Sequence, residues 1–189
     1  MEKSIIAVLL IGAAFIGYTT ISNNLTNKEI GACYCESIEE MVEWSEGRKA
    51  CVYKDSLGIP TIGIGFNLDR SDAPDACSRC GINYDAVYSG SKCISSSQIS
   101  CLFDYDLVWA QNGAKSCVPS FPSHHRCIRN VLIDMTFNMG KRSLCEWPKF
   151  VLELEEKNYE EAASNMKSTK WCSQVGRRCT RDAELIQSC

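Results

Sequence analysis

Residues 46–68, EGRKACVYKDSLGIPTIGIGFNL, constrain the fold most, because the spacing of apolar residues changes there from a helical period to a strand period. Residues 50–54 and 61–67 have strand composition, and turn-forming residues separate them. In residues 61–67, large apolar side chains alternate with a threonine and two glycines. This alternation predicts a single strand with one buried face and one face almost bare of side chains.

A helix is predicted immediately before this sheet. Ser37 and Glu40 have the spacing of a capping box, and apolar residues follow at helical intervals. Gly47 supplies a natural helix stop. At about 100° per residue, Glu46 lies on the shoulder of the apolar stripe that includes Val42. Its carboxyl group is therefore expected to be partly shielded from water.

The rest of the chain predicts a mostly helical body. Residues 69–94 lack periodicity and are rich in Asp, Ser, Gly and Cys, which indicates a cysteine-rich insertion with at most short local structure. A small sheet beside a helical body defines the α+β class, and we expect one such domain over residues 37–189. The further helices are expected from Ser95 or Ser96 to near Gly113, at 127–139 with Gly140 as the stop, and at about 147–157, 159–167 and 180–187.

The first 22 residues have the layout of a secretory signal peptide. An apolar run at residues 5–17 follows Lys3 and gives way to small polar residues, and it is short for a membrane span. Residues 23–36 form a short polar segment that includes a glycosylation sequon at Asn24. We expect a secreted protein, with a lysosome or digestive vacuole as the alternative, and no membrane attachment once the signal is removed.

The chain contains 13 cysteines, none of them in the leader, which favours an oxidising compartment and disulfides. An odd number leaves one thiol over, and the pairing stays open. Cys77, Cys80, Cys93 and Cys101 could instead be zinc ligands, but disulfides are favoured in a secreted chain. No metal or cofactor is expected.

Charge excludes one class of partner. With 20 Lys plus Arg against 23 Asp plus Glu, the net charge is −3. No basic field exists to attract nucleic acid or anionic membranes, so binding must depend on local contacts. We expect a monomer.

Two carboxyl groups are candidates for glycoside hydrolysis, which needs one protonated acid and one ionised carboxylate. Partial burial favours the protonated form of Glu46, whereas a polar turn keeps Asp55 ionised. Taken alone, the same two residues are more typical of a helix-end glutamate and a turn-capping aspartate than of a catalytic pair.

The full motif is more specific. Glu46, Asp55 and Thr61, with the run YKD-x-x-G-x-x-TIGIG, closely resemble the catalytic segment of the T4-type phage lysozymes, glycoside hydrolase family 24. The resemblance implies a lysozyme-like fold, with Glu46 as general acid and Asp55 and Thr61 holding the attacking water in an inverting reaction. It covers most of residues 37–187 through the runs IDMTFNMG, EEAASNM and KWCSQVGRR. By resemblance, the substrate-binding residues are Asn67, Phe137, Asn165 and Arg178, with Arg178 near the acid.

Three departures from the family are visible. Phe66 replaces a histidine that pairs with an aspartate, which is Asp106 in this chain, so that ion pair is expected to be absent. Phe150 replaces a polar cleft residue. The leader and the cysteine-rich insertion have no counterpart in the phage enzyme.

These features predict a secreted muramidase that hydrolyses the β-1,4 bond between N-acetylmuramic acid and N-acetylglucosamine in bacterial peptidoglycan, for defence or digestion. A catalytically silent peptidoglycan-binding protein is one alternative. A chitin oligosaccharide hydrolase that uses the same residues is another.

Overall fold

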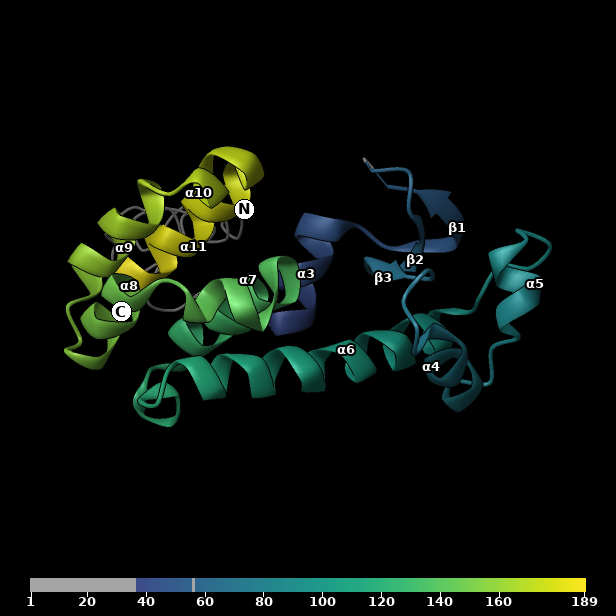
Figure 1. The fold of residues 1–189 in the computed structure, drawn as a ribbon, viewed down its shortest axis with the longest axis horizontal. Helices are drawn as coiled ribbons and strands as arrows, with labels where there is room; N and C mark the ends of the chain where they lie inside the picture. Colours follow the sequence, from purple (N-terminus) through teal and green to yellow (C-terminus); the bar gives the residue numbers. More distant parts are fainter. Residues whose placement is uncertain (1–36, 56) are drawn as a thin grey trace, which may run out of the picture. The chain divides into compact units, whose positions relative to one another are not determined.

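A computed structural model describes residues 37–55 and 57–189 of the chain (Figure 1). The predicted signal peptide, the segment at 23–36 and the sequon at Asn24 lie outside the described residues. Within the described part, no helix combines the length and the apolar character needed to cross a membrane.

Helix α3 (Ile38–Glu46) confirms the prediction made from the capping box. The Ser37 side chain accepts a hydrogen bond from the Glu40 backbone N–H, and the Glu40 carboxylate accepts one from the Ser37 backbone N–H. The helix ends where the Gly47 N–H donates to the carbonyl of Glu43. Glu46 is thus the last helical residue and stands where the chain turns into the sheet.

The sheet has three antiparallel strands in the order β1 (Lys49–Lys54), β2 (Pro60–Gly63) and β3 (Phe66–Asn67). The prediction of one continuous strand over 61–67 was wrong, because β2 and β3 pair with each other, with Thr61 opposite Asn67. Gly63 and Gly65 adopt φ values of 67° and 71°, a left-handed conformation that glycine tolerates well, and so reverse the chain. The bare strand face is therefore a tight turn.

The helical body confirms the α+β class. Long helix α6 (Ser96–Cys117) packs against α7 (Arg126–Cys145) and also against β2 and β3, and Figure 1 shows it running from the sheet towards the C-terminal helices. The other helices that follow the sheet are α4 (Ala73–Arg79), α5 (Tyr84–Tyr88), a short 3₁₀ turn (Phe121–Ser123), α8 (Pro148–Glu155), α9 (Tyr159–Lys167), α10 (Lys170–Val175) and α11 (Arg177–Gln187).

Several predicted helix ends were wrong. α6 continues past Gly113 to Cys117, because Gly113 lies where α7 packs closely and its missing side chain leaves room for Thr136. The helix predicted to stop at Gly140 does break there, with φ 81° and ψ 155°, but α7 then resumes and ends at Cys145. Helix α10 was not predicted, and α11 begins three residues before the predicted start at Thr180.

Two hydrophobic cores lie within the described domain. The first is formed mainly by α7 to α11 with the C-terminal half of α6, and the second by the sheet, α4, α5 and the N-terminal half of α6. Phe137 on α7 is half-buried and packs against both cores. It contacts Phe103 of α6, with 5.8 Å between the ring centroids.

Four disulfides join described cysteines, namely Cys51–Cys93, Cys80–Cys101, Cys117–Cys145 and Cys172–Cys179. Three of the four cysteines considered as zinc ligands are therefore bonded to other cysteines. Cys77 is buried and forms no disulfide. Burial raises the pKa of its thiol, which keeps it protonated and unreactive.

Asp106 has a different cation partner from the one that the family pattern suggests. Arg70 donates to Asp106 at 2.6 Å and to Asp72, and its guanidinium lies 4.7 Å from the centre of the Phe66 ring. The ring that replaces histidine thus supports an arginine that pairs with the same aspartate. The histidine pair is absent, as expected, but an ion pair at this aspartate is present.

Candidate active site

Glu46 is held by an arginine from the far end of the chain. Nη1 of Arg178, on α11, donates to Oε1 of Glu46 at 2.6 Å. The Glu46 side chain is 25% exposed, so it faces solvent on one side only, whereas Arg178 is almost fully buried. Burial opposes the charged form of Arg178, but Asp134 and Glu46 more than offset this effect and raise its pKa. A permanent cation therefore orients the Glu46 carboxyl group.

Asp134, on α7, fixes the position of Arg178. Its carboxylate accepts from Nε of Arg178 at 2.8 Å and from Nη2 at 2.9 Å, which is a bidentate pair. The remaining guanidinium nitrogen, Nη1, is thereby directed at Glu46. Arg181 also donates to Asp134, at 2.9 Å, and to the carbonyl of Met41 in the middle of α3. The network therefore also anchors the helix that carries Glu46.

Asp182 completes this buried group. Its Oδ1 accepts two bonds from Arg181, at 2.7 and 3.0 Å, whereas its Oδ2 is buried without a hydrogen-bond partner among the described residues. Burial first, and the nearby negative charge of Asp134 second, raise the pKa of Asp182 well above its usual range. Burial therefore favours the protonated form of Asp182 more than it does for an exposed aspartate.

The turn between β2 and β3 leaves space for Glu46. A Cβ atom at Gly65 would lie 3.3 Å from both Cγ and Oε2 of Glu46. The glycine is thus required both by its backbone conformation and by the carboxyl group beside it.

Asp55 and Thr61 lie on either side of the turn between β1 and β2. Oδ1 of Asp55 accepts the backbone N–H groups of Leu57 and Ile59, both at 2.8 Å. The Thr61 hydroxyl donates to the Ile59 carbonyl at 3.0 Å, which leaves its oxygen lone pairs able to accept. The same short turn therefore positions both residues.

Tyr53, on β1, is affected electrostatically by both acids. Burial is the main cause that raises the pKa of its phenol, followed by the negative charges of Glu46 and Asp55. Lys49 lies 3.9 Å from the centre of the Tyr53 ring.

The predicted substrate-binding residues do not all lie beside Glu46, Asp55 and Thr61. Asn67 is next to Thr61 in the strand pairing, and its Oδ1 accepts from the Asp69 N–H. Asn165 lies on α9, lines a separate hollow of about 210 Å³ with Trp147 and Phe150, and donates to Glu153 at 2.7 and 2.8 Å. Phe150 is buried against Trp147.

Sequence reasoning missed several residues of the site. Asp134, Arg181 and Asp182 lie on helices that were interpreted only as packing elements, and Tyr53 was noted only as part of the motif. A carboxylate within the buried, mostly apolar stretch at 131–136, as Asp134 is, was the available signal.

A small antiparallel sheet beside a helical body, with a glutamate and an aspartate near the sheet, is the arrangement expected of a lysozyme-type glycoside hydrolase. A model of the family described as phage lysozyme matches residues 43–182, and the chain belongs to that family.

Relatives of this chain are consistent with the family. The chain is 29% identical to probable T4-type lysozyme 1 of Dictyostelium discoideum and 30% identical to probable T4-type lysozyme 2, with 80% of this chain and 94% of each relative covered. It is also 26% identical to the pre-baseplate central spike protein Gp5 of Enterobacteria phage T4, covering 79% of this chain and 27% of that longer protein.

Proposed function

We propose that this lysozyme hydrolyses the β-1,4 bond between N-acetylmuramic acid and N-acetylglucosamine in bacterial peptidoglycan. The observation that carries the proposal is the fixed Glu46 carboxyl group, which Arg178 orients at 2.6 Å and which keeps one solvent-facing side beside Gly65. A carboxyl group held in this way can donate a proton to a leaving oxygen with little reorganisation.

Asp55 and Thr61 supply the second half of the reaction in this proposal. The Asp55 carboxylate takes one proton from the attacking water, and the Thr61 oxygen accepts a hydrogen bond from the hydrogen that the water keeps. Two backbone N–H groups hold Oδ1 of Asp55 in place, which fixes the carboxylate beside the site of the attacking water in this proposal. Attack from the face opposite Glu46 inverts the anomeric centre.

The proposed setting is outside the cell or in a digestive compartment, for defence against bacteria or their digestion. Four disulfides in the described part support an oxidising environment. We propose that the folded protein acts as a monomer.

The test compares the wild type with Glu46→Gln and with Glu43→Gln. Glu43 lies on the same helix in a part-exposed ion pair with Arg48, so its replacement changes the charge equally without touching the acid. We expect Glu46→Gln to abolish release of reducing ends from peptidoglycan, while Glu43→Gln retains it. Equal activity of Glu46→Gln and the wild type would refute the role of the acid.

Two further measurements address the alternatives. Proton NMR of the first product formed distinguishes inversion from retention by the anomer that appears. Parallel assays on chitin oligosaccharides test the second substrate, and wall binding without any release of reducing ends would support a silent binding protein.

A further inference from the structure

A second hollow, of about 280 Å³, lies beside Glu46 on the helical side of the site. Besides Glu46 and Arg178, it is lined by Trp44 of α3, Asn138 of α7, Val175 of α10 and Arg177 of α11. Asp55 and Thr61 belong to the sheet and take no part in it. Because Glu46 is the proposed general acid, a group bound in this hollow would lie beside the bond that is cleaved.

The charges around this hollow leave one cation unneutralised. Arg178 is paired with Asp134 and Glu46, and Arg181 is paired with Asp134 and Asp182. Arg177 is exposed, and among the described residues no carboxylate lies within ion-pair distance of it. The hollow therefore offers an available positive charge to an anion.

Trp44 gives this cation a supporting surface. Trp44 is 51% exposed, and its indole has two arginines nearby, with the Arg177 guanidinium 5.3 Å and the Arg181 guanidinium 5.0 Å from its ring centre. An arginine that rests on an aromatic face keeps its N–H fork available for a carboxylate.

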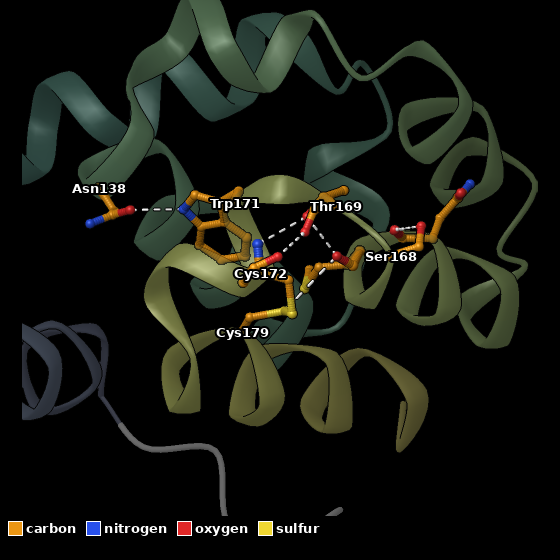
Figure 2. Close-up of a disulfide and its surroundings, with 9 residues drawn as sticks. Asn138, Ser168, Thr169, Trp171, Cys172 and Cys179 are labelled. Atoms are coloured by element: carbon orange, nitrogen blue, oxygen red, sulfur yellow. Dashed lines mark hydrogen bonds between the residues drawn. A yellow bond between two sulfur atoms is a disulfide. The ribbon is translucent and has the colours of Figure 1, made fainter.

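The corner between α10 and α11, which carries Val175 and Arg177, is covalently fixed. The disulfide Cys172–Cys179 closes the seven-residue interval around it, and the turn passes through Gly176 with φ 53° (Figure 2). Trp171 at the start of this corner donates to Oδ1 of Asn138 at 2.8 Å, which ties α10 to α7. A wall held in this way loses little conformational entropy when it binds.

We propose that Arg177 and Trp44 form a subsite for a carboxylate of the stem peptide beside the cleaved bond of the glycan strand. The inference rests on the proposed function, because that function identifies the strand. A sugar face or peptide backbone packs against the Trp44 indole while the Arg177 guanidinium binds the carboxylate.

The test is a binding measurement in the Glu46→Gln background, which leaves the strands uncleaved and keeps an oxygen for Arg178. Titration calorimetry would compare Glu46→Gln with Glu46→Gln/Arg177→Gln on soluble glycan strands that retain their peptides and on strands from which an amidase has removed them. We expect the Arg177 change to raise Kd roughly fivefold to tenfold on peptide-bearing strands only, as for loss of one charge-assisted hydrogen bond at a part-exposed site.

Arg142→Gln in the same background is the matched control, since Arg142 is a highly exposed arginine whose side chain lines no part of this hollow. An equal Kd with and without Arg177, or an equal loss on both kinds of strand, would overturn the subsite. An effect seen only with walls that retain phosphate-containing polymers would assign the anion to phosphate and overturn the peptide. Hydrolysis by the wild type is measured separately, so failure of the proposed function is distinguishable from failure of the subsite.

Discussion

Gly65 shows how much of this site depends on a single missing side chain. We expect Gly65→Ala to lower kcat at least about tenfold, because the added methyl group would displace the Glu46 carboxyl group that lies 3.3 Å from it. Initial rates of reducing-end release would measure this effect.

Gly81→Ala is its control. Gly81 has φ 64° and nothing within 4 Å of its Cβ position, so the backbone strain of about 1 to 2 kcal/mol is common to both changes. Thermal unfolding should show similar destabilisation of the two variants. A Gly65→Ala enzyme with wild-type kcat, or an equal loss in Gly81→Ala, would contradict the prediction.

Asp182 predicts a pH dependence of stability. Its folded-state pKa is raised above the unfolded value near 3.8, so the folded protein binds the proton more tightly than the unfolded chain. Its favourable contribution is complete below pH 3.8 and is lost as the pH rises through the folded pKa. Asp182→Asn keeps an oxygen for Arg181, and its amide can donate towards Asp134.

We therefore expect Asp182→Asn to gain stability relative to the wild type as the pH rises from 4 to 8. Unfolding temperatures measured across this range provide the test. Asp75→Asn, which removes an exposed carboxylate, serves as the control. A difference between wild type and Asp182→Asn that stays constant with pH would show that Asp182 is already ionised in the folded protein.

At the level of elements, the close contact of α6 and α7 at Gly113 makes a packing prediction. A Cβ atom there would lie 2.7 Å from Cγ2 of Thr136. Although alanine favours helix more than glycine does, we expect Gly113→Ala to destabilise the protein by about 1 to 3 kcal/mol through overpacking. Urea unfolding would measure the change.

Thr136→Ser provides the matched rescue. Serine lacks Cγ2 but retains the hydroxyl that donates to the Leu132 carbonyl at 2.7 Å. The double variant should therefore recover most of the stability lost in Gly113→Ala. If the double variant is no more stable than the sum of the two single changes predicts, the steric explanation is wrong.

The elements also show where sequence reasoning succeeded. α3 and the start of β1 were predictable because the capping box, Gly47 and the change of period are all local signals. The turn at Gly63 and Gly65 was not, because alternation in so short a segment fits both a strand and a hairpin. The end of α6 depends on α7, a contact between segments distant in the sequence.

The site also contains contacts that the sequence predicts and contacts that it does not. The motif brings Asp55 and Thr61 together through one turn of the backbone, so their proximity followed from the sequence. The contact of Glu46 with Arg178 spans 132 residues, and only the family resemblance suggested it. Nothing local in the sequence indicates that Arg178 binds Asp134 and Glu46 at the same time.

For the whole molecule, the disulfides should contribute unequally to stability. Cys51–Cys93 closes an interval of 42 residues and Cys172–Cys179 one of 7. In the chain-entropy account, replacing each pair by serines costs roughly 4 and roughly 2 kcal/mol respectively. Urea unfolding of the two double variants would measure both, and an equal or reversed order would show that native packing, not loop closure, sets the contributions.

The four disulfides also determine how the chain would respond to a pulling force. Two of them join segments of the sheet-side core, between residues 51 and 101, and two join segments of the helical core, at 117–145 and 172–179. None of these four bonds connects the two sets. Once the contacts of α3 with α7 and α11 have broken, a load applied across the described domain would pass from one disulfide-bonded half to the other through α6, between Cys101 and Cys117. In an optical trap, we expect α6 to unfold and extend, whereas the segments closed by the disulfides on either side cannot extend and do not add to the measured change in length.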